Sequence, residues 1–314
     1  MKNFGNTTNT RPASLSDYPA RHEEWTSNGG RRSHRSTGRE SAAAPAVTVV
    51  TVVRNGSATL MRAAESVLSQ DYPGIEYVVI DGQSTDDTVP ILCSLGERVA
   101  LWVSEPDAGI SDAFNKGISL ARGQIVGLLN CDDWYEPGAV QAAVEALECA
   151  DADIVCGEVQ YWEGDQKTYL VSSDPELLDR GMTVAHPTVF VRRRYYEQCG
   201  LFRLDFKLAM DYEWLLRAKL SGARMRVLER CLANMSGGGI GDRRWRESQC
   251  EVARARALHV PGANTMSAYY FYVWRSTVKG VVRRYLDLLG LGILRRWYHR
   301  WCSQVSVTST QERR

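Results

Sequence analysis

The chain has 314 residues and a formal net charge of +1, from 38 lysines and arginines against 37 aspartates and glutamates. That length can bury a sizeable core, and a near-neutral chain gives no electrostatic reason to expect a nucleic acid as partner. The 8 cysteines form no CxxC pair and no Cys/His cluster, which argues against a zinc site or a disulfide framework and favours a reducing cytoplasm. The sequence also lacks the ~18-residue apolar stretch of a membrane-spanning helix and an apolar signal-peptide core.

The N-terminal segment differs in composition from the rest. Residues 1–45 are rich in Ser, Thr, Asn, Arg and Gly and have almost no aliphatic pattern. Such a segment buries too little apolar surface to offset its conformational entropy, so we expect it to be disordered. We expect one folded domain over residues 46–235, followed over 236–314 by a flexible loop and a basic, amphipathic helical region.

Between residues 47 and 149, short β-branched runs alternate with amphipathic segments. The expected strands are 47–53, 75–80, 99–103 and 125–129, and the expected helices are 58–70, 84–95, 110–121 and 137–149. Strands alternating with helices at this spacing predict an α/β fold with a doubly wound, mostly parallel sheet. The later pattern is weaker: a hairpin around residues 163–165, a strand at 188–192, a helix at 208–220 and a strand-like stretch at 226–229.

Polar side chains follow the expected strands where each one ends. Arg54 and Asn55 follow the first strand, Asp81 the second, and the run Asn130 to Asp133 the fourth. Ligands of doubly wound sheets bind beyond these carboxyl ends, so these residues mark a candidate site.

Asp132 and Asp133 are adjacent carboxylates at the end of a buried strand. Their repulsion and desolvation are costly unless a cation offsets them, so the pair favours a hard divalent ion beneath a phosphate group. The alternative is that Asp133 caps the next helix and Asp132 is solvated. The sequence has neither GxGxxG after the first strand nor GxxxxGK[ST], so hydride transfer and phosphate-loop hydrolysis are poorly supported.

Six collinear segments resemble the family 2 glycosyltransferases. They are VTVVTVVRNG, VVIDGQSTDDT, SEPDAGISDAFNKG, GLLNCDDWYEPGA, HPTVFVRR and LAMDYEWLLRA, between about residues 47 and 228. The nearest type is that of bacterial exopolysaccharide and colanic-acid biosynthesis. The resemblance implies a GT-A fold, with a Rossmann-like nucleotide-binding half and an acceptor half. It also implies sugar transfer from a nucleoside-diphosphate sugar, with UDP favoured over GDP or dTDP.

The resemblance also implies roles for residues of the donor cleft. Asp81 would accept a hydrogen bond from the nucleotide base, with Arg54 and Asn55 nearby. Asn115 and Lys116 would line the nucleotide cleft.

The run from Asn130 to Asp133 occupies the place of the family's DxD motif. Asp132 would hold a divalent cation, Mn or Mg, that bridges the diphosphate. Asn130 would face the ribose, and Asp133 would lie near the donor sugar or support the loop. The family often has Asp at the position of Asn130, so this chain has one charge fewer there.

Asp211 matches the family's catalytic base. Its apolar neighbours in sequence should raise the pKa of its carboxyl group, which suits a proton acceptor near neutral pH. The alternative is a first-turn acid favoured by the helix dipole. His186 matches a family histidine on the acceptor side, with a buried structural histidine as the alternative. We expect Glu213 to be solvated.

The resemblance implies that the reaction is a single displacement that inverts the anomeric configuration. A sugar nucleotidyltransferase is the rival enzyme, although the chain has no basic glycine loop for three phosphates. A non-catalytic binding protein on the same fold is the other alternative. Retention of Asp81, Asp132 and Asp211 argues against it.

Residues 269–302 combine an apolar stripe with arginines, Trp and Tyr. This pattern favours a helix lying in a membrane interface. The resemblance implies a lipid-linked or growing surface-polysaccharide acceptor at the inner face of the plasma membrane, which fits such a helix. The alternative is a helical tail packed on the catalytic domain.

Overall fold

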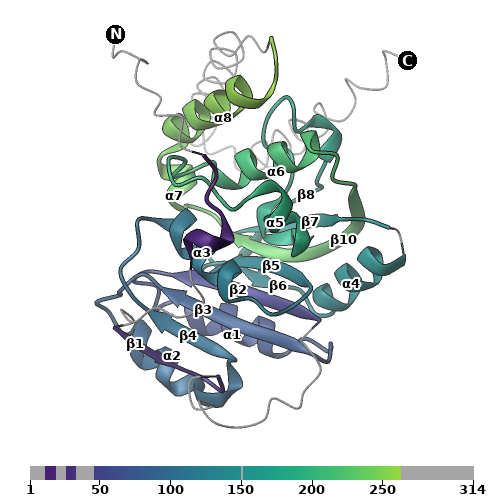
Figure 1. Cartoon of the computed structure of the whole chain (residues 1–314). Helices are drawn as coiled ribbons and strands as arrows, with labels where there is room; N and C mark the ends of the chain where they lie inside the picture. The colour runs from purple at the N-terminus through teal and green to yellow at the C-terminus, as the bar shows by residue number, and fades with distance from the viewer. Residues whose placement is uncertain (1–10, 19–25, 33–45, 150, 263–314) are drawn as a thin grey trace, which may run out of the picture.

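The computed structural model describes residues 11–18, 26–32, 46–149 and 151–262 (Figure 1). Within these residues ten strands form one sheet in the order β1-β4-β3-β2-β5-β9-β7-β10-β6, with β8 paired to β7. The strands are β1 Ser27–Gly29, β2 Val47–Val53, β3 Ile75–Asp81, β4 Leu101–Ser104, β5 Ile125–Asn130, β6 Trp134–Tyr135, β7 Ile154–Glu163, β8 Gln166–Val171, β9 Phe190–Arg192 and β10 Met225–Ser236. The α-helices are α1 Leu60–Leu68, α2 Thr88–Leu95, α3 Ile110–Leu120, α4 Ala139–Cys149, α5 Arg194–Cys199, α6 Met210–Leu220, α7 Ile240–Arg243 and α8 Trp245–His259. Short 3-10 helices are η1 Leu15–Asp17, η2 Gly96–Arg98, η3 Pro175–Leu177 and η4 His186–Thr188.

The first half of the sheet is parallel. β4, β3, β2 and β5 run side by side in the same direction, and every residue of β2 is buried. Continuous β-branched strands buried on both faces are typical of such a sheet. The predicted α/β class with a mostly parallel core is therefore confirmed. The second half is mixed, because β9 is antiparallel to β5 and β7, while β10 is parallel to β7 and antiparallel to β6.

Helices cover both faces of the sheet, and each face has its own hydrophobic core. α1, α2 and α4 bury their apolar side chains on one face, and α3, α6 and α8 on the other. Figure 1 shows α1 and α2 below the sheet and α6 and α8 above it. α3 packs closely on β2, since a Cβ added to Gly117 would lie 2.2 Å from Cγ1 of Val50. This packing brings the polar strand ends of the first half and the helix carrying Asp211 into one body.

Parts of the N-terminal segment are ordered, although we expected disorder over residues 1–45. β1 pairs antiparallel with β4 and thereby forms the edge of the sheet, and Gly29 lies against the Trp102 ring. The Tyr18 side chain is only 8% exposed, and its hydroxyl donates to Asp112 Oδ1 at 2.7 Å. Composition misses this arrangement because a strand can pair with a sheet edge through its backbone alone, without an apolar pattern.

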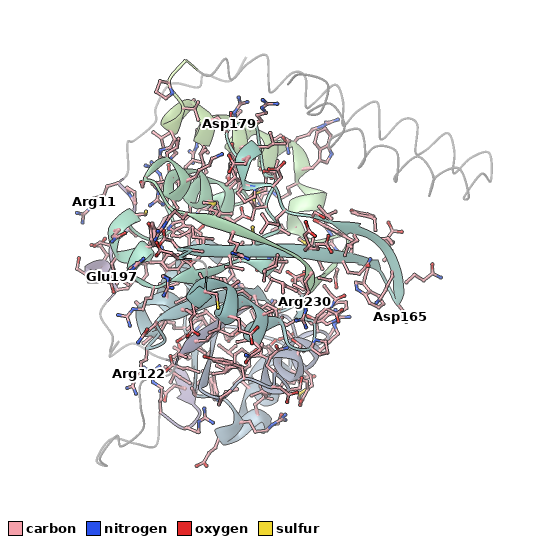
Figure 2. All side chains as sticks on the ribbon, turned by 90° about the vertical axis from the view of Figure 1, so that its right-hand side faces the viewer. Arg11, Arg122, Asp165, Asp179, Glu197 and Arg230 are labelled. Atoms are coloured by element: carbon pink, nitrogen blue, oxygen red, sulfur yellow. The ribbon has the colours of Figure 1, made fainter. Side chains whose placement is uncertain are left out.

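The second half also differs from the sequence prediction. β7 and β10 are longer than expected, α7 lies near the start of the region over 236–314 that was predicted to begin with a flexible loop, and the pattern did not reveal α8. Figure 2 shows Asp165 at the far end of the β7–β8 hairpin, away from the helices. Residues 269–302, predicted to contact a membrane, lie outside the described residues. None of the described helices is long and apolar enough to cross a membrane.

The prediction that Glu213 is solvated is wrong. Its side chain is completely buried and pairs with Arg217 at 3.0 Å, while His259 Nε2 lies 2.7 Å from Glu213 Oε1. A charge can be buried in this way because its partners offset the lost hydration. One partner comes from α8, 46 residues later.

Candidate active site

Asp81 and Asn55 organise the loop that follows β3. The Asp81 carboxylate is buried and accepts hydrogen bonds from the Ser84 backbone N–H at 3.1 Å and from Ser104 Oγ at 2.6 Å. Asn55 has a φ of 53°, a left-handed conformation that Asn tolerates, and its Oδ1 accepts from the Thr85 N–H at 2.8 Å. Two strand ends are thus tied together by local hydrogen bonds.

Arg54 lies beside this loop with an exposed side chain. A Cβ added to Gly82 would lie 3.5 Å from Cδ of Arg54 and 2.1 Å from Oδ2 of Asp107. No hydrogen bond or ion pair joins the Arg54 guanidinium to the residues that the structure describes. The group is therefore available to an anionic ligand at this edge of the sheet.

Lys116 and Asn115, both on α3, have different surroundings. The Lys116 ammonium pairs with Glu105 at 2.8 Å, just beyond β4, and lies 3.4 Å from Asp112 Oδ2. Asn115 is completely buried, and its amide exchanges two hydrogen bonds of 2.9 Å with the Phe202 backbone. In the described residues Asn115 therefore joins α3 to the chain leading towards α6.

The turn after β5 is held by hydrogen bonds to its backbone. The Asp132 carbonyl oxygen accepts from Arg62 Nη2 at 3.1 Å and from Ser236 Oγ at 2.8 Å. The Arg62 guanidinium also lies 3.7 Å above the centre of the Trp134 ring. This turn is thereby connected to α1 and to the end of β10. Sequence reasoning did not identify Arg62 or Ser236, because no local pattern marks either one.

The side chains of the turn carry unsatisfied oxygens. Asp133 is 2% exposed, and burial together with the neighbouring Asp132 charge raises the pKa of its carboxyl well above the usual range. Asn130 Nδ2 donates to Asp133 Oδ2 at 3.2 Å, whereas the buried Asn130 Oδ1 has no partner among the described residues. Within the described part of the chain, the Asp132 carboxylate also makes no hydrogen bond or ion pair.

These oxygens could supply some of the ligands of a divalent cation, but not all of them. The described ranges contain no group of three or more His, Cys, Asp or Glu side chains that could enclose a metal ion. An unpaired carboxylate and an unpaired amide oxygen at the end of one strand nevertheless match the hard oxygen ligands of Mg or Mn. Such ions are often held by one or two carboxylates and complete their coordination with substrate phosphates and water.

Asp211 and His186 face the same small pocket. Asp211 lies in the first turn of α6 and His186 opens η4, and the other pocket walls are largely apolar, among them Leu128 and Trp214. Burial raises the pKa of the Asp211 carboxyl, while the nearby His186 and the Tyr212 N–H, 2.8 Å from Oδ1, act in the opposite direction. A carboxylate in this setting is a better proton acceptor near neutral pH.

The His186 ring connects this pocket electrostatically with the turn after β5. Burial lowers the pKa of the imidazole, although the Asp211 and Asp132 carboxylates both act to raise it. A lowered pKa makes neutral imidazole the main form at pH 7. Its Nε2 is buried without a hydrogen-bond partner among the described residues.

The comparisons with known proteins agree with this geometry. The model of the family "Glycosyl transferase family 2" matches residues 48–209. An uncharacterized glycosyltransferase of Mycobacterium tuberculosis is 35% identical over 214 residues, which cover 64% of this chain and 79% of that protein.

Two solved structures share the fold. TarS 1-349 of S. aureus in complex with UDP-GlcNAc aligns with a TM-score of 0.57 and 17% identity, over 69% of this chain and 67% of that one. The mannosyltransferase PcManGT from Pyrobaculum calidifontis, in complex with GDP-Man and Mn2+, aligns with a TM-score of 0.54 and 17% identity, over 87% and 89%. The predicted α/β fold of the GT-A class is thereby confirmed.

Proposed function

The chain belongs to glycosyl transferase family 2, and on that premise we propose that it moves a sugar from a nucleoside-diphosphate sugar to an acceptor hydroxyl, with inversion at the anomeric carbon. The observation that carries this proposal is that Asp211 and His186 line one small pocket, while the Asp132 charge acts on the same His186 ring. A turn suited to a metal–diphosphate group and a carboxylate suited to take a proton thus both act on one histidine.

The donor would bind at the carboxyl ends of β2, β3 and β5. In this proposal the exposed Arg54 meets the negative charge of the donor, and Asp81, held by Ser84 and Ser104, accepts a hydrogen bond from the base. Asn55 shapes the loop. TarS was solved with UDP-GlcNAc and PcManGT with GDP-Man, which supports a nucleotide-sugar donor here, and we propose UDP first.

Lys116 and Asn115 take part in this proposal through their contacts with the protein. Lys116 holds Glu105 at the end of β4, and Asn115 fixes the backbone at Phe202. Both residues would keep the walls of the donor cleft in place.

Asp132 would hold a divalent cation, Mn or Mg, with Asn130 Oδ1 directed towards the same donor group. A bound cation stabilises the negative charge of the departing diphosphate. Asp133, buried and bonded to Asn130, would support the turn. The structure of PcManGT contains Mn2+ together with GDP-Man, which supports the same requirement here.

Asp211 would act as the general base. The acceptor hydroxyl oxygen attacks the anomeric carbon, the bond from that carbon to the diphosphate oxygen breaks with its electron pair, and the hydroxyl proton passes to Asp211. Attack from the face opposite the leaving group inverts the configuration. His186, with its unpaired Nε2, would orient the acceptor side of the pocket.

The proposed acceptor is a lipid-linked or growing surface polysaccharide at the inner face of the plasma membrane, as in exopolysaccharide biosynthesis. Basic residues near position 300 support it, although they lie outside the described residues. Family membership favours sugar transfer over nucleotidyl transfer and over a non-catalytic binding role.

Calorimetric titration with UDP, GDP and dTDP, each with and without MnCl2, tests the donor site. We expect one nucleotide to bind, and binding to weaken strongly when the metal is chelated. Protein that is shown to be folded and binds none of the three would contradict the proposal and favour the binding-protein alternative.

A further inference from the structure

A carboxylate from α8 holds the chain segment that leads into α6. Glu251 accepts hydrogen bonds from three consecutive backbone N–H groups, those of Lys207 at 2.9 Å, Leu208 at 2.8 Å and Ala209 at 2.9 Å. Asp211 follows two residues later. This contact joins a helix outside the family match, which ends at residue 209, to the helix of the proposed base.

The N-terminus of α6 has no cap of its own. The N-cap residue is Ala209, whose side chain has no acceptor, although Asp211 Oδ1 accepts from the Tyr212 N–H within the first turn. The first N–H groups of a helix need an acceptor, which usually comes from a neighbouring Ser, Thr, Asp or Asn. Glu251, which lies far away along the chain in α8, supplies an acceptor for the N–H groups of the residues just before this turn.

Other residues of α8 hold the same segment on either side. Arg254 donates to the Asp205 carbonyl oxygen at 2.7 Å, and its guanidinium lies 3.9 Å from the centre of the Phe206 ring. His259 lies 2.7 Å from Glu213 Oε1. Glu251 and His259 are eight residues apart, about two helical turns, so they lie on one face of α8. That face fixes the chain before and after Asp211.

We propose that Glu251 is a positioning residue for sugar transfer, because its hold on residues 207–209 sets the direction in which α6 presents Asp211 to the pocket. This inference rests on the proposed role of Asp211 as the base. The function of Glu251 is to keep the Asp211 carboxylate at the acceptor hydroxyl, and Glu251 itself makes no contact with substrate.

Glu251 also acts on Asp211 through its charge. His186 from η4 lowers the pKa of the Asp211 carboxyl, an effect that requires its protonated ring, and Glu251 from α8 raises it. Replacing Glu251 with a neutral residue removes a nearby negative charge that raises the pKa of the Asp211 carboxyl, so this pKa falls. The acidic limb of the pH–rate profile then moves to lower pH.

The test compares Glu251→Gln and Glu251→Ala with Glu247→Gln as the matched control. Glu247 lies on the same helix, is exposed and pairs with Arg244 at 2.9 Å, so its replacement should leave activity unchanged. The assay follows nucleotide release from UDP-GlcNAc and from GDP-mannose with MnCl2 across the pH range, using the full chain. Thermal unfolding and nucleotide titration are measured for each variant.

We expect Glu251→Ala to lower turnover by about tenfold to a hundredfold with nucleotide binding unchanged, the scale expected for a misplaced catalytic group. Glu251→Gln keeps an acceptor oxygen, so it should restore part of the rate and show an acidic limb displaced to lower pH. If the Ala variant does not fold, the pH profile of the Gln variant decides.

Wild-type rates and pH profiles in both Glu251 variants, with Asp211→Asn inactive, would overturn the inference and leave the proposed function standing. Full activity of Asp211→Asn would instead refute the part of the proposed function on which this inference rests, the assignment of Asp211 as the base. The two failures are therefore distinguishable.

Discussion

The two halves of the molecule hold their candidate functional residues in different ways. In the first half, residues 47–130, Asp81 and Asn55 are fixed by hydrogen bonds from the loop that follows β3, those of Ser84 and Thr85. In the second half, the surroundings of Asp211 come from three distant segments, namely η4, the chain near Phe202 and α8. Figure 1 shows α6 and α8 on the same side of the sheet.

This difference indicates which substitutions should affect each half of the molecule. The loop after β3 is held by its own hydrogen bonds, so it should tolerate changes in α8, although the turn after β5 also depends on Arg62 and Ser236. A base placed by long-range contacts depends on helices that carry no catalytic group, so changes in α8 should affect the reaction without affecting donor binding. The following predictions test this contrast.

The largest effect on stability is expected at Glu213. Glu213→Gln removes one partner of a buried ion pair with Arg217, which should lower the free energy of unfolding by about 3–5 kcal/mol. Urea denaturation measures the loss. Glu197→Gln is the matched control, because Glu197 pairs with Arg193 on the surface and should cost about 1 kcal/mol or less.

The same residue predicts a pH dependence. Hydrogen bonds from His259 and Arg217 hold the pKa of the Glu213 carboxyl below its usual value despite burial. The stability that Glu213 contributes is therefore present above its unfolded pKa of about 4.5 and is lost as the pH falls through the folded value. The difference in stability between wild type and Glu213→Gln should shrink in acid. A difference that grows in acid would contradict this assignment.

At Asp132 we expect a smaller effect, on metal-dependent nucleotide binding and not on stability. Asp132→Ala removes the unpaired carboxylate of the turn after β5, so Mn-dependent nucleotide binding should weaken about tenfold to a hundredfold, while the thermal stability changes little. Asp165→Ala, at the tip of the β7–β8 hairpin, is a suitable control (Figure 2). Unaltered metal dependence in Asp132→Ala would place the cation elsewhere.

The smallest effect on nucleotide binding is expected from replacing Arg62. Arg62→Ala removes a hydrogen bond to the Asp132 carbonyl oxygen and the contact with the Trp134 ring, together about 1–2 kcal/mol. Nucleotide binding with Mn should weaken several-fold in calorimetry, and Arg62→Lys should recover only part of it because it lacks the planar group. Equal binding by wild type and Arg62→Ala would show that the turn keeps its shape without Arg62.

The sequence predicted the first half well because its signals are local. The β-branched runs at 47–53 and 125–129 mark β2 and β5 without help from the rest of the chain, and the polar residues at their ends follow directly. The roles given to those residues came from the family resemblance and stay predictions.

The second half was harder to predict because its determinants are distant in sequence. α8 buries only Val252 and Ala255 and carries charged residues along its whole length, so its pattern did not reveal a core helix. The burial of Glu213 depends on His259, and β1 forms through backbone pairing alone. A prediction made from a short stretch of sequence cannot include these partners, because they lie far away along the chain.

The most direct test of the account is to measure nucleotide binding and turnover side by side in Asp211→Asn. The substitution keeps the size of the side chain but removes its ability to accept the proton. We predict nucleotide binding equal to wild type, with metal dependence intact, and a turnover about 10²–10⁴-fold lower. Turnover at the wild-type rate would contradict the assignment of Asp211 as the base.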